Sequence, residues 1–214
     1  YDPKGLLYQH ILDPALLENL PSHGNFFIKT HVEARPEGVE ALRRHNVPTT
    51  VLMRDLRDQC VSRFYHVLNS PSHRHHDFYV NGDKAEAFTH CVEICVTEYA
   101  NWIRGWAKVA REDEQFLLVR YEDMRENIKT QFLRALKRFD IELADDKVEM
   151  IIEQVAAKSK SGSNLETRLK QGNSLRSGRV GDWRSHFSPG DVKIFKEKAN
   201  DTLVSLGYEK DDSW

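Results

Sequence analysis

Short apolar runs alternate along the chain with longer segments in which large side chains recur at helical spacing. Three of the short runs are rich in β-branched and aromatic residues and predict strands. They lie at residues 25–30 (NFFIKT), 49–53 (TTVLM) and 115–120 (QFLLVR). Because helical segments separate these runs, the pattern predicts an α/β fold with a mainly parallel central sheet.

The helical segments are recognised by their apolar spacing and by the residues at their ends. Ser188 followed by Pro189 marks one start, because serine caps a helix and proline suits its first turn, and this helix should end near Gly207. The composition of residues 69–83 predicts a loop. The other predicted helices cover residues 36–46, 55–68, 84–111, 124–139 and 145–157.

Charge is unevenly distributed, although the formal net charge of the 214 residues is only -2. Residues 158–187 carry seven Lys or Arg against two acidic residues, which favours an anionic partner. A solvated basic loop and a nucleic-acid surface are the alternatives, but no RNA-binding or helix-turn-helix signature supports the latter, so we expect no nucleic acid. The length, with 40% hydrophobic and 30% charged residues, is typical of one globular domain.

The cysteines and histidines predict no metal site and no disulfide framework. The three cysteines form no CxxC motif, which makes a reducing compartment the expectation, and Cys91 and Cys95 are interpreted as small core residues of a helix. His73, His75 and His76 are interpreted as a solvated cluster, because no second ligand group has a recognisable spacing. No apolar run is long enough to span a membrane and no signal-like stretch opens the chain, so we expect a cytoplasmic protein.

Polar side chains follow each predicted strand. The three strand ends read Lys29-Thr30-His31, Arg54-Asp55 and Arg120-Tyr121. Ligands of parallel α/β sheets gather at the carboxyl ends of the strands, so these groups are candidates for one site.

Four blocks in a fixed order extend this pattern: FFIKTH, VLMRDLRDQCVSRFYH, LLVRYEDM and RSGRVGDWRSHFS. Together they resemble the cytosolic type of sulfotransferase that depends on 3′-phosphoadenosine 5′-phosphosulfate (PAPS), over about residues 25–207. The resemblance implies a three-layer, P-loop nucleotide-kinase-like α/β fold. It also implies in-line transfer of a sulfuryl group from PAPS to a hydroxyl or amine, with 3′-phosphoadenosine 5′-phosphate (PAP) as product and no metal required.

The resemblance assigns roles to several residues. Arg54 and Ser62 fall at the positions that hold the 3′-phosphate, and a guanidinium fork and a hydroxyl near a helix start are good phosphate ligands. Tyr121 falls where the family contacts adenine; the structural alternative is a half-buried aromatic residue at a strand end. The complete set of implied donor-binding residues is Arg54, Ser62, Tyr121, Arg176, Ser177 and Gly178.

His31 falls at the position of the family's catalytic base and Lys29 at that of a cation beside the transferred group. A neutral imidazole can accept the proton of an attacking hydroxyl at cellular pH. The two residues are two positions apart, so on a regular strand their side chains share a face.

The sequence also departs from the family pattern. The family's phosphosulfate loop, a strand followed by a Pro-Lys-Ser-Gly-Thr-Thr-like turn, is not found, and Ser177 replaces a lysine common in relatives, with Arg179 as a candidate substitute. We therefore expect residues 1–214 to form a single sulfotransferase domain without its N-terminal phosphosulfate-binding strand and loop. Either the sequence begins downstream of that loop, or the chain is a non-catalytic nucleotide-binding relative. A P-loop kinase would require GxxxxGK[ST], which is also absent.

The acceptor is expected to be a small molecule or a glycan with a hydroxyl or amine. Its pocket would be built from variable segments such as residues 69–83, so its identity does not follow from the sequence. The family's dimerisation pattern after Gly181-Asp182-Trp183 is altered here, which leaves the oligomeric state open.

Overall fold

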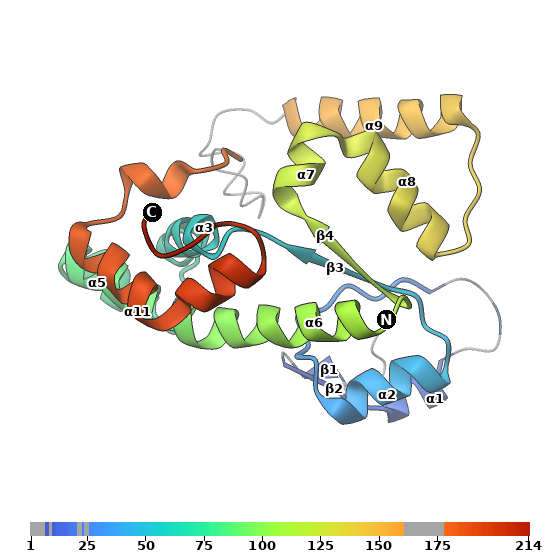
Figure 1. Cartoon of the computed structure of the whole chain (residues 1–214), viewed down its shortest axis with the longest axis horizontal. Helices are drawn as coiled ribbons and strands as arrows, with labels where there is room; N and C mark the ends of the chain where they lie inside the picture. The colour runs from blue at the N-terminus through green and yellow to red at the C-terminus, as the bar shows by residue number, and fades with distance from the viewer. Residues whose placement is uncertain (1–6, 9, 21–22, 24–25, 161–177) are drawn as a thin grey trace.

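The computed structural model describes residues 7–8, 10–20, 23, 26–160 and 178–214. Two parallel strands, β3 (Thr49–Met53) and β4 (Phe116–Arg120), lie at its centre, with Thr49 opposite Phe116 and Met53 opposite Arg120 (Figure 1). Two of the three predicted strands and their parallel pairing are therefore confirmed.

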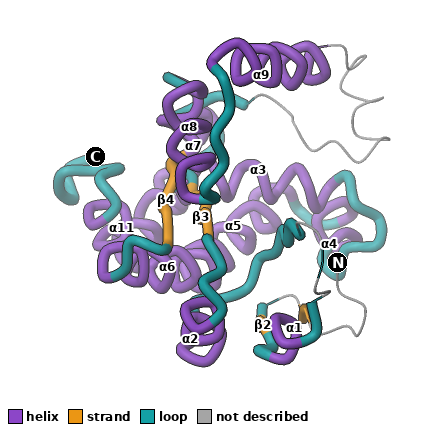
Figure 2. Tube along the Cα trace, turned by 90° about the vertical axis from the view of Figure 1, so that its right-hand side faces the viewer, coloured by secondary structure: helices purple, strands orange, loops and turns teal. Residues whose placement is uncertain are grey.

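Helices cover both sides of this strand pair. Helix α6 (Ala100–Glu112) runs along one side and α8 (Ile128–Arg138) along the other, as Figure 1 shows. Figure 2 shows the two strands from the side, with α3 and α5 next to each other beyond them. The layered α/β arrangement expected from the sequence is present.

The remaining elements are short strands, helices and single helical turns of other types. In chain order they are β1 (Leu7–Tyr8), β2 (Ile11–Leu12), α1 (Ala15–Glu18), α2 (Pro36–Arg44), α3 (Leu56–Leu68), α4 (His76–Asn81), α5 (Lys84–Ile94), the π-helical η1 (Cys95–Tyr99), α7 (Tyr121–Glu126), α9 (Asp145–Lys160), the 3-10 helix η2 (Asp182–Ser185) and α11 (Pro189–Ser205).

Two apolar clusters form the core. The larger joins α3, α5, η1, α6 and α11, with Phe195 and Val67 among its fully buried members. The smaller joins β2, α1 and α2 to the sheet through Trp106 and Phe116, whose rings are 5.9 Å apart. The apolar spacing of residues 84–111 therefore marks core positions, as predicted.

The strand predicted at residues 25–30 is wrong. Residues 26–35 form an extended loop, and no described strand pairs with residues 26–30. An apolar, β-branched run becomes a strand only where a neighbour accepts and donates ladder hydrogen bonds. Here the Trp102 and Trp106 indoles donate to the Val32 carbonyl at 2.8 and 2.9 Å, and Phe27 is 75% exposed.

Two further segments differ from the prediction. Residues 69–83 are not entirely loop, because α4 forms within them and buries Tyr79. The helix predicted at residues 124–139 is two helices, α7 and α8, which meet at Asn127. Asn127 leaves helical geometry and accepts a hydrogen bond from the Thr130 N–H, so it caps α8, a role that asparagine favours over a helix-interior position.

Helix α11 begins as predicted, with Ser188 as its cap and Pro189 in its first turn. The Ser188 hydroxyl accepts from the Asp191 N–H, and the buried Asp191 carboxylate accepts from the Ser188 N–H and hydroxyl and from Thr89. The predicted end is confirmed by Gly207, whose φ of 72° is the left-handed geometry of a helix C-terminus. Within the described part of the chain, no helix combines the length and apolarity needed to cross a bilayer.

We predict that Ser188→Ala lowers the free energy of unfolding by about 1 kcal/mol, because it removes the cap of α11. The thermal midpoint should fall by about 2–4 °C for a chain of this size. Ser205→Ala, an exposed serine near the end of the same helix, is the matched control and should change stability by less than about 0.5 kcal/mol. Equal effects in the two variants, measured by thermal denaturation, would contradict a capping role.

Candidate functional site

The carboxyl ends of β3 and β4 bring Arg54 and Tyr121 side by side. Arg54 follows Met53 and Tyr121 follows Arg120, and these two strand residues are opposite each other in the register. The Arg54 guanidinium lies over the Tyr121 ring, 4.6 Å from its centre. Two residues that follow different strands, far apart in the sequence, thus form one surface, as the parallel pairing of the strands predicts.

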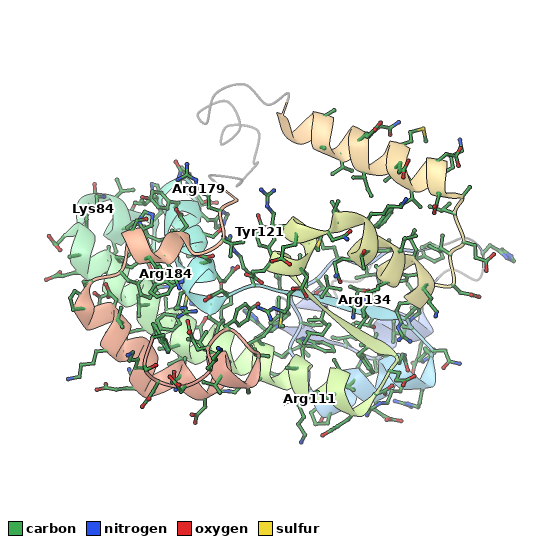
Figure 3. The ribbon with its side chains drawn as sticks, turned by 45° about the horizontal axis from the view of Figure 1, so that its top comes forward. Lys84, Arg111, Tyr121, Arg134, Arg179 and Arg184 are labelled. Carbon is green, nitrogen blue, oxygen red and sulfur yellow. The ribbon has the colours of Figure 1, made fainter. Side chains whose placement is uncertain are left out.

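Residues 178–183, called the late segment below, cover this surface. The Tyr121 hydroxyl donates to the Gly178 carbonyl at 3.0 Å, and the Arg54 guanidinium donates to the Arg179 carbonyl at 2.7 Å. Figure 3 shows Tyr121 and Arg179 close together, approaching from α7 and from the segment that precedes η2. Gly178 has a φ of 62°, a conformation that a side chain would strain. The structure therefore brings Arg54, Tyr121 and Gly178 together.

A buried carboxylate in α3 holds the late segment in place. Asp58, whose side chain is fully buried, accepts hydrogen bonds from the Gly181 N–H at 2.7 Å and the Trp183 N–H at 2.9 Å. It also lies 3.6 Å from the Arg54 guanidinium. A buried charge is tolerated when it is paired and hydrogen-bonded in this way.

Arg54 keeps donors that the described protein does not use. Its Nε is buried, and no hydrogen-bond partner for it occurs among the described residues. Buried N–H groups are almost always hydrogen-bonded in native structures. An anion with several oxygens would satisfy this donor, so the position fits a phosphate.

Ser62 lies on the same side of α3 as Asp58. Asp58 and Ser62 are four residues apart within α3, and side chains at that spacing follow one another along a helix face. Arg54 lies before the helix and reaches Asp58 through its guanidinium. Ser62 is half-buried. Arg176 and Ser177 lie outside the described residues.

Lys29 and His31 lie in the loop of residues 26–35, and both side chains are exposed. The loop is anchored from α6, because the Trp102 indole donates to the carbonyls of His31 and Val32. No described hydrogen bond or ion pair joins Lys29 or His31 to Arg54 or Tyr121. Lys29 and His31 are thus positioned by contacts to α6, whereas Arg54 and Tyr121 are positioned by contacts to the late segment.

The C-terminal residues close over the start of α3. Arg57, nearly fully buried, lies between the Trp183 and Trp214 rings, 4.2 and 4.4 Å from their centres, and binds the carboxylates of Asp55 and Glu209. Burial alone would lower the pKa of Arg57, but the two carboxylates raise it overall. A cation held on all sides fixes the turn from β3 into α3.

Sequence reasoning missed the residues that assemble this site. Asp58 lies in a helix that was predicted from its apolar positions alone, and the residues that donate to its carboxylate are more than a hundred positions away in the sequence. Trp102 anchors the loop that carries Lys29 and His31, and the available signal was that an indole N–H requires an acceptor when it is buried.

The clustered histidines are part of the folded structure rather than fully solvated. The His73 and His75 rings are 5.5 Å apart and half-buried, and the His76 ring contacts the Val67 carbonyl. Desolvation, with help from nearby Arg side chains, lowers the pKa of His73 and of His75. Among the described residues these rings are not part of any group placed to share a metal ion.

Comparison with known proteins finds similar sequences and similar structures. The family model described as "Sulfotransferase domain" matches residues 10–206. The chain is 26% identical over 119 residues to Sulfotransferase 2A6 of Mus musculus, covering 50% of this chain and 41% of that protein. It is 24% identical over 125 residues to the amine sulfotransferase of Oryctolagus cuniculus, covering 51% and 41%. The chain thus spans less than half the length of these relatives.

The fold is similar to that of a retinol dehydratase solved in complex with retinol and PAP. The TM-score is 0.64 at 19% sequence identity, and the superposition covers 88% of this chain and 56% of that one. The predicted fold class is therefore confirmed.

We predict that Asp58→Asn releases the late segment from α3, because an amide NH₂ would face the N–H groups that the carboxylate now accepts. The free energy of unfolding should fall by about 2–4 kcal/mol, and hydrogen exchange at the Gly181 and Trp183 amides should accelerate. The exposed Asp201 on α11 offers a matched control, Asp201→Asn, which should leave both measurements unchanged. Retained protection of both amides in Asp58→Asn would show that other contacts hold the segment.

Proposed function

The chain belongs to the sulfotransferase family, and on this premise we propose that it transfers a sulfuryl group from PAPS to a hydroxyl or amine. The convergence of Arg54, Tyr121 and Gly178 at the carboxyl ends of two parallel strands carries the proposal. A buried guanidinium N–H there has no described protein partner, as expected of a donor reserved for an anion. We further propose that residues 1–214 are a single sulfotransferase domain.

The 3′-phosphate of the donor binds to Arg54 and Ser62 in this proposal. The planar Arg54 guanidinium supplies the charge and can bind two oxygens at once, and the Ser62 hydroxyl, one turn beyond Asp58 on α3, donates a further hydrogen bond. Arg176 and Ser177 join them from the segment that leads into Gly178. Tyr121 contacts the adenine.

His31 acts as the base and Lys29 stabilises the charge that develops near the transferred group. The His31 imidazole takes the proton of the attacking hydroxyl or amine as the sulfur–oxygen bond to PAP breaks on the opposite side of the sulfur. Catalysis of this kind rests on positioning and electrostatic stabilisation. The Trp102 contact to the His31 carbonyl supports the role, because it fixes the backbone that carries the base.

The acceptor is a small molecule in this proposal, and the protein acts in the cytoplasm. One relative is described as an amine sulfotransferase, and the retinol dehydratase structure contains retinol and PAP. These names support an amine or an apolar alcohol as the first acceptors to try.

The test is transfer of labelled sulfate from PAPS by the full-length protein to a panel of amines, phenols, steroids, aliphatic alcohols and glycans. Labelled product with PAP release supports the proposal. Tight binding of PAP without transfer to any acceptor would instead identify a non-catalytic nucleotide-binding relative, and neither binding nor transfer would refute both.

We predict that His31→Ala lowers turnover by about 10² to 10⁴-fold while PAP affinity stays within about twofold, because a general base does not contact the nucleotide. Initial-rate measurements give the turnover, and calorimetric titration gives the affinity for PAP. The control is His45→Ala at the exposed end of α2, which should retain wild-type turnover. Normal turnover in His31→Ala would exclude the base role, and lost PAP affinity would place His31 in the nucleotide site.

We predict that Ser62→Ala weakens PAP binding by roughly 10 to 150-fold, the effect of one hydrogen bond to a charged group. Arg54→Ala should weaken it at least as much, because a charge and a fork are lost. Neither variant should alter the weaker binding of adenosine 5′-phosphate, which has no 3′-phosphate. Calorimetric titration of both nucleotides, with Ser205→Ala as control, decides between a phosphate contact and damage to the fold, since damage would weaken both nucleotides equally.

A further inference from the structure

The three cysteines of the chain meet in the core. Cys60 comes from α3, Cys91 from α5 and Cys95 from the start of η1. Their sulfur atoms all lie within 4.8 Å of one another, and each residue is fully buried. Motif spacing does not predict this cluster, because Cys60 and Cys91 are 31 positions apart.

A buried cation completes the cluster. The Arg63 guanidinium lies 3.6 Å from the Cys91 sulfur and 3.2 Å from the Tyr79 hydroxyl, and its residue is 7% exposed. An arginine is rarely placed in a core without a negative partner. Among the described contacts of Arg63 none is to a carboxylate. A thiol is ordinarily more acidic than a tyrosine hydroxyl, so the Cys91 sulfur is the better placed of these groups to carry the balancing charge.

The backbone is also unusual here. The long helix leaves α geometry at Cys95 and makes one π-helical stretch, Cys95–Tyr99, before α6 begins. Such π-bulges are rare and occur frequently at functional sites. The π-helical stretch begins at Cys95, a member of the cluster. It is an observation about the backbone and does not depend on the distances between the sulfur atoms.

We propose that Cys60, Cys91 and Cys95 bind one divalent, thiophilic metal ion of the Zn²⁺ or Cd²⁺ class. Three sulfurs about 2.3 Å from a shared ion would be about 4 Å apart, which is compatible with the observed spacing. Soft thiolates select such ions over Mg²⁺ or Ca²⁺. The inference does not depend on the proposed sulfuryl transfer.

Charge balance favours a divalent ion. Three thiolates carry three negative charges, which one divalent ion and the Arg63 guanidinium neutralise together. A monovalent ion would leave a net negative charge in the core, at a large desolvation cost.

Metal binding must release protons, since the ligands bind as thiolates. The Arg63 guanidinium, 3.6 Å from the Cys91 sulfur, is placed to stabilise the negative charge that the thiolates then carry.

The test is titration of the reduced, chelator-treated protein with Cd²⁺, followed by the ultraviolet thiolate-to-cadmium charge-transfer band. We expect one ion per chain and a rise in thermal midpoint that Mg²⁺ does not reproduce. Absence of the band, or an equal rise in midpoint with Mg²⁺, would overturn the proposal.

Variants locate the ion. Cys60→Ala, Cys91→Ala and Cys95→Ala should each weaken Cd²⁺ binding by about 100-fold or more, whereas the double variant His73→Ala/His75→Ala should bind as wild type. Unchanged binding in all three cysteine variants, or lost binding in the histidine variant, would move the ion elsewhere. If the cysteine variants do not fold, X-ray absorption of the Zn²⁺-loaded wild type counts the ligands: three sulfur neighbours support the site, and only nitrogen or oxygen neighbours exclude it.

Discussion

One buried carboxylate organises the edge of the strand pair where β3 and β4 end. Asp58 accepts hydrogen bonds from the backbone N–H groups of Gly181 and Trp183 and pairs with Arg54, so a single charge joins the end of β3, the first turns of α3 and a segment more than a hundred residues later. Because an unpaired carboxylate would be very costly in that position, all three parts must be in place together. The surface that we propose to bind the donor therefore forms only in the complete fold.

The same arrangement explains why Arg54 suits an anion. Its planar group is held by the Tyr121 ring, the Arg179 carbonyl and the Asp58 carboxylate. These contacts fix the direction of the guanidinium, while its Nε has no partner among the described residues. A cation that is already oriented loses little conformational entropy when a ligand arrives, which favours binding.

Local signals predicted most of this fold. The positions of β3, β4 and α3 and the capping box of α11 follow from apolar spacing and cap residues, which act over a few neighbouring positions. The strand expected at residues 25–30 fails because a strand needs a partner, and partners are not encoded locally. The meeting of Arg54 with Tyr121 was predicted because parallel strands end at one edge, whereas Asp58 and the sulfur cluster depend on contacts between distant segments.

Helix α3 carries both proposed sites on different faces. Cys60 lies two residues from both Asp58 and Ser62, or about 200° around the helix from each, so the sulfur cluster faces the core while the donor site faces the strand ends. An ion in the core would stabilise every folded molecule by mass action. The ion would change the affinity for the donor only by moving α3. A ligand alters the affinity of a second site only when both ligands bind two conformations of the protein with different affinities. Arg57 and Asp58 hold the first turns of that helix by separate buried contacts, which makes such a movement costly. In these two proposals the core site would accordingly set the stability of the protein, while the binding of the donor would depend on Arg54 and its neighbours.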